Sequence, residues 1–203
     1  SGSHLKANTQ SADIIVLPVT NRNRSIQVVK RVKKTVEIKM GYLFDGLVMN
    51  AADALFEEMY DSEDPDSLSR HFNITRGLKV NMTTYRDQYN TLMNHAWVNL
   101  LNRKDQPALP NPPDDVKKVL KAYSERNQNH YKILLEELRQ RFSVLVGQDM
   151  TFHPMLPGNF YLCFWHASEK FDLTHQERYL MLPLYNRFNQ SLAEQGYNPA
   201  KLR

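Results

Sequence analysis

A thiol and an imidazole stand three residues apart in the second half of the sequence, at Cys163 and His166. Such a pair could supply a nucleophile and its base. A catalytic thiolate needs an electropositive and partly exposed setting, whereas Cys163 stands between Leu162 and Phe164. These neighbours favour a small core residue. Because Cys163 is the only cysteine, neither an intrachain disulfide nor a thiolate metal cluster can form.

Five side chains of metal-ligand type lie close together in the sequence and could in principle hold a metal ion. They are His166, Glu169, Asp172, His175 and Glu177. The Glu-x-x-His motif of di-iron bundles is missing, and so are the Gly-x-Ser-x-Gly, Walker, dinucleotide-binding and His-Glu-x-x-His motifs. We interpret the five as surface and helix-capping residues. We therefore predict no catalytic residue, no metal site and no cofactor, and expect that the chain is not an enzyme.

Four tyrosines fall on the expected core faces of helices and could line a cavity for a small ligand. They are Tyr85, Tyr89, Tyr123 and Tyr131. The usual role of such residues is packing, with the ring buried and the hydroxyl near the rim. A small-molecule sensor therefore remains the third functional option.

Charge is sorted along one stretch of the chain, and this is the best indication of a binding surface. Residues 22–39 carry seven bases and one acid, Glu37, whereas residues 45–66 carry eight acids and no base. This order opposes the helix dipole, which favours acids at the start of a helix and bases at its end. The predicted partner-binding or polyanion-binding residues are Arg22, Arg24, Lys30, Arg31, Lys33, Lys34 and Lys39.

Two kinds of partner fit the basic residues. They could contact phosphates or an acidic protein face, as nucleic-acid-binding proteins and charged interfaces do. They could instead contact the acidic stretch of a second copy, since two first helices paired antiparallel would place basic starts against acidic ends. The net charge of +4 and the isoelectric point near 9.1 decide little between them.

The elements that position these residues are helices. Residues 27–59 have an apolar stripe at spacings of three and four, which predicts one long amphipathic helix. The stripe consists of Val32, Val36, Met40, Leu43, Leu47, Ala51, Leu55 and Met59.

The remaining helices are predicted from the same spacing of apolar residues, and proline and glycine residues mark where they begin and end. A second long helix is expected at 65–101, with Asp64 as its cap, and a proline-rich loop at 103–113. A third is expected at 114–146, and a shorter aromatic one at 159–171. Thr174 and Glu177 predict a capping box that starts a last helix, which Pro183 should kink or split. We predict an all-α, elongated antiparallel bundle of four to five helices, three of them long.

The domain division is simple. Residues 1–25 are expected to form an N-terminal arm, of which 1–4 resemble an expression scar, and 26–203 the helical bundle domain. Within the arm, 21–25 should be a loop that ends in a cap at Ser25. No apolar run is long enough to span a membrane, and the single cysteine fits a reducing compartment. We expect a cytoplasmic protein.

Two pairs of segments resemble a known family. The first pair is Met49-Asn50-Ala51-Ala52-Asp53-Ala54-Leu55-Phe56 and Phe72-Asn73-Ile74-Thr75-Arg76-Gly77-Leu78; the second is His153-Pro154-Met155-Leu156-Pro157 and, beyond Phe164, Leu184-Tyr185-Asn186-Arg187-Phe188-Asn189-Gln190-Ser191-Leu192 with Gly196. In order and separation they resemble the N-terminal part of the proteobacterial domain of unknown function 1631 family. His153, Trp165, His166 and Phe188 depart from its pattern.

The resemblance implies no enzymatic activity. Members of that family are several times longer, so it implies a domain of a longer protein or a short relative, with a regulatory or scaffolding role in the bacterial cytoplasm. Together with the sorted charge, it favours a non-catalytic interaction module that binds a protein partner of unknown identity and could self-associate through the first helix. The alternative is nucleic-acid or nucleotide-signal binding through residues 22–39.

Overall fold

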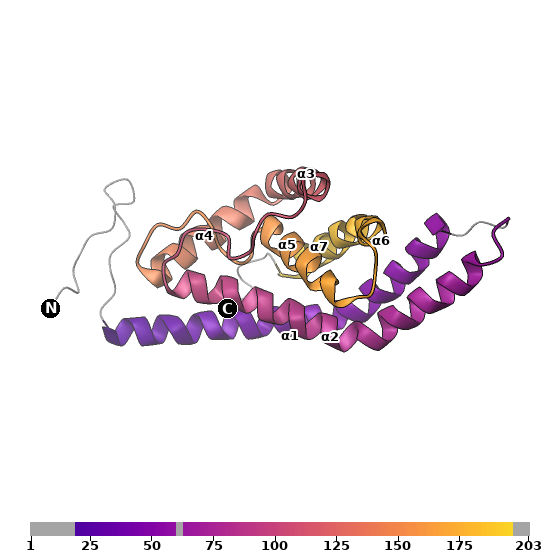
Figure 1. Ribbon diagram of the computed structural model, residues 1–203. Helices are drawn as coiled ribbons and strands as arrows, with labels where there is room; N and C mark the ends of the chain where they lie inside the picture. The colour runs from indigo at the N-terminus through magenta and orange to yellow at the C-terminus, as the bar shows by residue number, and fades with distance from the viewer. Residues whose placement is uncertain (1–18, 60–62, 197–203) are drawn as a thin grey trace.

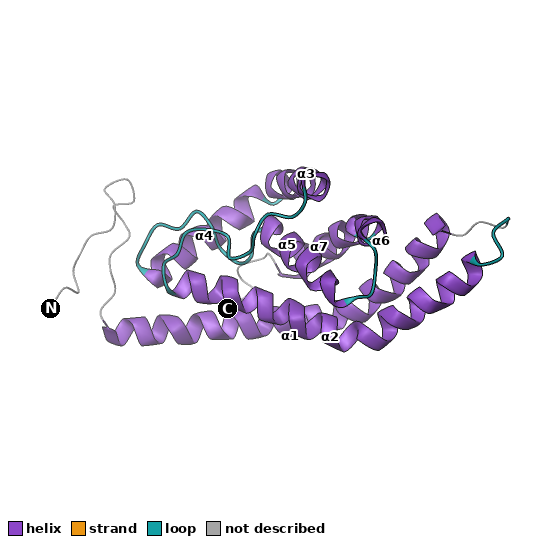
Figure 2. Ribbon diagram, viewed as in Figure 1, coloured by secondary structure: helices purple, strands orange, loops and turns teal. Residues whose placement is uncertain are grey.

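The chain folds into helices throughout the part that the structure describes. The computed structural model describes residues 19–59 and 63–196, in which there is no strand (Figures 1 and 2). The all-α prediction is therefore confirmed. The elements are α1 Val19–Met59, α2 Ser67–Leu101, α3 Asp114–His130, α4 Lys132–Val146, α5 Pro157–Ala167, the 3-10 turn η2 Ser168–Lys170, α6 His175–Leu180 and α7 Leu182–Gly196.

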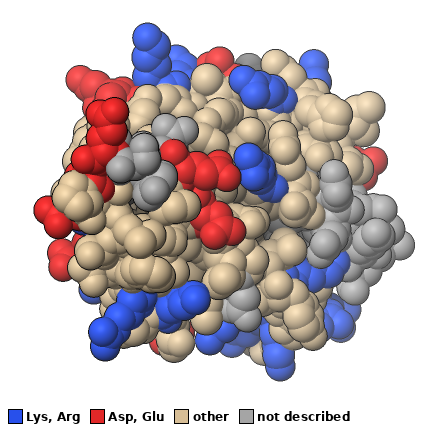
Figure 3. Space-filling model, turned by 90° about the vertical axis from the view of Figure 1, so that its right-hand side faces the viewer, with Lys and Arg blue, Asp and Glu red and all other residues tan. Residues whose placement is uncertain are grey.

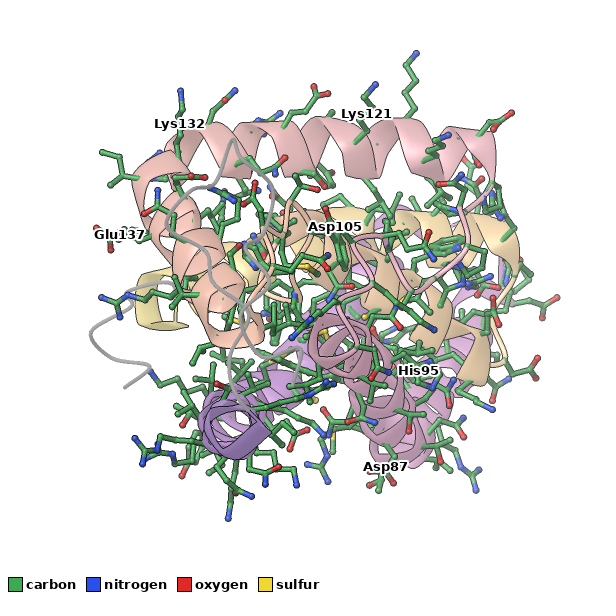
Figure 4. The ribbon with its side chains drawn as sticks, turned by 90° about the vertical axis from the view of Figure 1, so that its left-hand side faces the viewer. Asp87, His95, Asp105, Lys121, Lys132 and Glu137 are labelled. Atoms are coloured by element: carbon green, nitrogen blue, oxygen red, sulfur yellow. The ribbon has the colours of Figure 1, made fainter. Side chains whose placement is uncertain are left out.

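The two longest helices form the base of the molecule. α1 and α2 run antiparallel and in contact, and the shorter helices lie along one side of the pair (Figure 1). α5 occupies the centre, where it contacts α2, α3 and α7. α3 runs across the long pair, since it is seen end-on in Figure 1 and lengthwise in Figure 4. The predicted antiparallel arrangement therefore describes α1 and α2, and not α3.

The start of α1 corrects the predicted arm. The helix begins at Val19, so the loop expected at 21–25 is wrong. Ser25 is not a cap; it is only 7% exposed, on the same helical face as Val29 and Val32. This face lies near Leu101 and Val146, at the ends of α2 and α4. Packing there outweighs the weak helix propensity of the asparagines nearby. The rest of the arm, residues 1–18, lies outside the described residues.

Two other predicted boundaries are displaced. The third long helix is two helices, because the chain turns at Tyr131 after four residues of low or moderate helix propensity, 127–130. α2 begins at Ser67, because Asp66 donates its N–H to the Asp64 carboxylate in a turn (2.9 Å) and leaves Pro65 outside the helix. The predicted split near Pro183 is confirmed, with the break at Met181 between α6 and α7.

One ring lies at the centre of the core. Phe164 on α5 packs against aromatic rings from α1, α2 and α7. It stacks on Tyr185 with centroids 5.1 Å apart, meets Phe188 edge-on at 4.7 Å, and lies 4.7 Å from Tyr89 and 6.1 Å from Phe44. Such pairs contribute beyond their buried area, and this cluster joins four helices through one side chain.

A buried histidine anchors the connector between α4 and α5. His153 is fully buried, and its Nδ1 accepts the N–H of Met155 at 3.2 Å. The pKa of His153 is lowered to about 3, chiefly by burial and in smaller part by the charge of Arg139, while the Leu135 backbone acts in the opposite direction. His153 is therefore neutral at pH 7, with its proton on Nε2.

We expect Phe164→Ala to lower the free energy of unfolding by about 3–5 kcal/mol, because it removes a fully buried ring and leaves a cavity among four helices. Urea unfolding followed by circular dichroism measures the change. Phe72→Ala is the matched control, since Phe72 is 63% exposed and its loss should change stability by less than about 0.5 kcal/mol. Equal effects of the two substitutions would contradict this account of the core.

We expect the free energy of unfolding to fall as the pH is lowered, with a slope that depends on His153. Below pH 6.5 the unfolded chain binds a proton at His153 that the folded chain excludes until about pH 3. The free energy of unfolding should therefore lose about 1 kcal/mol per pH unit in this window. His153→Asn should flatten the dependence between pH 6 and pH 4 in urea unfolding, whereas His95→Asn, which removes an exposed histidine, should leave it unchanged. Equal slopes for His153→Asn and the unchanged chain would refute the assignment.

Candidate interaction surface on α1

The predicted basic residues all lie on α1, but they do not form one group. Five of them are exposed, and Lys33 and Lys39 are half-buried. Four of the exposed ones lie within an arc of about 120° on the outward side of the helix, at 100° per residue. These four are Arg24, Lys30, Arg31 and Lys34. Arg22 lies apart from them, beside Arg103 near the end of α2.

Lys33 belongs to the fold more than to a free surface. Its ammonium donates to Asn94 Oδ1 on α2 and lies 3.8 Å from the Glu37 carboxylate on its own helix. These contacts join α1 to α2 and use the charge internally. Lys33 is therefore the predicted site residue with the weakest claim to an external partner.

The outward side of α1 also carries apolar side chains that the sequence interpretation passed over. Ile38 is 52% exposed, Tyr42 83% and Met49 48%. They continue the line of Arg31 and end towards Asp53, which is exposed. Their positions, opposite the buried stripe at helical spacing, were the signal that could have revealed them. We call this side, from Arg24 to Asp53, the outer face of α1.

Two glycines leave space on this helix. A Cβ added at Gly41 or Gly46 would meet no atom within 4 Å. Gly46 is exposed and stands between Tyr42 and Met49 on the same side. The space at Gly46 is open, so an apolar side chain of a partner could approach the helix backbone there, beside the exposed ring of Tyr42.

The charge order places the two signs at opposite ends of the outer face. Bases occupy the first half of α1, and Asp53 and Glu57 are exposed in the second half. The end of the molecule where α1 stops and α2 starts carries a group of acidic side chains (Figure 3). Figure 4 looks along α1 from the other end and shows the helix at the edge of the molecule, with one side free of other helices.

The other candidates for chemistry do not form a site. The Cys163 thiol is fully buried and burial raises its pKa, so the prediction of a core residue is confirmed. His175 bonds Asp115 at 2.7 Å and lowers the pKa of that carboxyl, while His166 pairs with Glu169 at 3.6 Å. In the described part of the chain, no three potential ligands gather closely enough to hold a metal ion.

The tyrosines at the centre of the core do not open a cavity. Tyr85 and Tyr89 are fully buried. Tyr85 donates its hydroxyl to the carbonyl of Phe164 at 3.2 Å, and Tyr89 donates to the Met40 sulfur at 3.4 Å. Both rings are thus committed to packing, which confirms their usual role over that of ligand contacts.

Comparison with protein-family models, curated proteins and solved structures gave no match. The resemblance to the domain of unknown function 1631 family therefore stays a prediction, and the functional argument depends on the geometry of α1. Within the described residues, none of the helices has both the length and the apolar character needed to cross a membrane.

Proposed function

We propose that this chain is a non-catalytic helical interaction module whose contact surface is the outer face of α1, and that the first partner of this face is a second copy of the chain. The observation that carries the proposal is the combination on one free helical face of exposed apolar residues, an open glycine position and charges sorted by sign. Exposed apolar groups flanked by charge are typical of protein contact surfaces.

The order of residues on this face is self-complementary. In an antiparallel pair with its two-fold axis at Tyr42, Arg31 of one copy meets Asp53 of the other, because both stand eleven positions from Tyr42. By the same rule Ile38 meets Gly46, so an apolar side chain faces an open position. A two-fold axis repeats each contact, so both ion pairs and both apolar contacts form together.

This pairing gives a reason for a charge order that weakens an isolated helix. Of the exposed charges on α1, Arg22 and Glu57 lie near enough to its ends to oppose its dipole, at a cost of a few tenths of a kcal/mol each. Opposite charges brought together at an interface offset this cost and fix the antiparallel register. A helix of about 60 Å at ~1.5 Å per residue provides ample length for a stable interface.

The family resemblance extends the proposal to a biological role. Under it, the module belongs to a cytoplasmic bacterial protein with a regulatory or scaffolding role, and self-association or binding of another protein through α1 would be its contribution. The proposed interface itself depends only on residues of this chain.

We expect the native chain to be a dimer and single charge reversals at the paired positions to weaken it. Arg31→Glu and Asp53→Arg each place like charges opposite one another twice in the homodimer. Mixing the two variants restores both ion pairs, so the mixture should form a heterodimer while each variant alone shifts towards monomer by about tenfold in dissociation constant, which corresponds to ~1.4 kcal/mol. Light scattering after size-exclusion chromatography, with one variant carrying a size tag, measures the species.

The control is Lys79→Glu, which reverses an exposed charge on α2 and should leave the assembly unchanged. Added salt at about 0.5 M should also weaken the native dimer, because exposed ion pairs are screened. A native chain that stays monomeric at high concentration, or variants that fail to recombine on mixing, would refute the antiparallel register.

Nucleic-acid binding is the second candidate, and a specific observation favours it. Arg24, Lys30, Arg31 and Lys34 are exposed on one side of α1, and in the described residues no carboxylate forms an ion pair with any of them. Such a row can contact phosphates along one strand or across a groove.

Duplex DNA titrations at 50 mM and 200 mM salt test this alternative. With four phosphate contacts, the binding constant should fall about a hundredfold between the two salt concentrations. Asp53→Arg separates the two candidates, because it adds a positive charge to the outer face of α1. It should strengthen DNA binding if nucleic acid is the partner, and weaken self-association if a second copy is the partner. No binding at 50 mM salt would remove the nucleic-acid candidate.

A further inference from the structure

A separate cavity lies on the side of the molecule away from α1. It has a volume of about 270 Å³, is open to solvent, and is lined by the loop between α2 and α3, one side of α3, and the start of α5. Its walls are mainly apolar. The apolar residues are Pro107, Pro112, Leu120, Phe152, Leu156 and Leu162. A space of this size could hold about nine water molecules at ~30 Å³ each, which corresponds to a small organic molecule.

The polar residues of the cavity have a clear sign of charge. Lys117 and Lys121 contribute to its lining from successive turns of α3, and no acidic residue is among the described residues that line it. Neither lysine forms an ion pair within the described part of the chain. Lys121 is exposed, and in Figure 4 its side chain extends outward from α3, away from the body of the molecule. Ser124 and Gln128 add neutral hydrogen-bonding groups along the same side of α3.

The first turn of α5 also contributes positive electrostatic potential at the cavity. Gly158 and Asn159 stand at this turn and line the cavity, so the positive end of the helix dipole points towards it. α5 and α3 approach each other closely here, since a Cβ added at Gly158 would lie 3.4 Å from Ser124 Oγ, at contact distance. The lysines and the helix end therefore act in the same direction on an anion.

Hydrogen bonds hold the loop wall in place at several points. The Asp105 carboxylate accepts the N–H groups of Thr151 and Phe152 at 2.9 and 2.7 Å. Gln148 donates its side-chain amide to the Arg103 carbonyl at 3.0 Å, and His166 donates to the Pro110 carbonyl at 2.9 Å. These bonds tie the loop to the connector before α5 and to α5 itself. The cavity is therefore formed before any ligand arrives.

We propose that this cavity binds a small amphipathic anion, with an apolar ring or chain between the loop and α5 and a carboxylate, sulfonate or phosphate at Lys117 and Lys121. Ligand sites typically combine apolar walls with a few convergent polar groups that fix orientation, as here. The site shares no residue with the outer face of α1, so the inference is independent of the proposed interaction surface.

A neighbouring cavity offers less positive charge to an anion. It has a volume of about 320 Å³ and meets the first at Gln128 and Leu156. Its arginine, Arg139, is already bound by the carboxylates of Glu136 and Asp149. Lys132 is then its one basic residue without an ion pair among the described residues, and Glu136 also lines it, whereas the first cavity has two such lysines and no acid.

The test uses two fluorescent probes with the same aromatic body, 1-anilinonaphthalene-8-sulfonate and the neutral N-phenyl-1-naphthylamine, titrated into the native full chain. We expect saturable binding of the sulfonate. The double variant Lys117→Glu/Lys121→Glu should weaken it by tenfold or more, while affinity for the neutral probe changes less than twofold. Lys118→Glu is the matched control, because Lys118 is exposed on α3 but does not line the cavity.

The location is checked by the amide chemical shifts of Gly158 and Asn159, which should move on titration with the sulfonate. Circular dichroism confirms that each variant is folded. Three results would overturn the proposal: no saturable sulfonate binding by the native chain, equal losses of both probes in the double variant, or a loss with Lys118→Glu as large as that of the double variant.

Discussion

The fold depends on the insertion of one apolar helix into the angle between the long pair and the shorter helices. α5 presents Phe164 to rings of α1, α2 and α7 together, and most of its side chains are buried. Because a helix buried on all sides has no solvated face, its polar groups must find partners inside the protein. Tyr85 meets the carbonyl of Phe164, and Arg178 donates to the carbonyl of Trp165 while its guanidinium lies 3.9 Å from the centre of that ring.

This insertion also decides what remains for binding. The inner face of α1 packs against α2, α4 and α7, and Lys33 takes part in the contact with α2. What is left of the helix is a single face that nothing in the described chain covers. On the opposite side, α3 has few neighbours, and its contact with the start of α5 leaves the space under the proline-rich loop. The two candidate surfaces thus lie on opposite sides of the packing around α5.

Local signals in the sequence predicted those features that local interactions control. The apolar stripe from Val32 to Leu55 is buried as expected except at Leu43, which is half-buried, and Thr174 and Glu177 form the predicted capping box. Signals that depend on distant neighbours failed. The start of α1 is helical because of contacts with α2 and α4. The basic stretch was found from charge alone. The hydrogen bond from Lys33 to Asn94, which weakens the case for Lys33 as a binding residue, could not be predicted in this way because the two residues are 61 positions apart. The cavity under the loop combines residues from 107 to 162, which no periodic pattern connects.

The hydrogen bonds that hold the proline-rich loop affect the conformational entropy lost when a ligand binds. The prolines of the loop restrict the unfolded chain. Its bonds to Thr151, Phe152, Gln148 and His166 restrict the folded one, so little conformational freedom is left to lose when a molecule enters. A protein whose binding-competent conformation is already the dominant one binds its ligand with the full intrinsic affinity. Occupancy would then report the concentration of the ligand directly, with no intervening rearrangement of the loop.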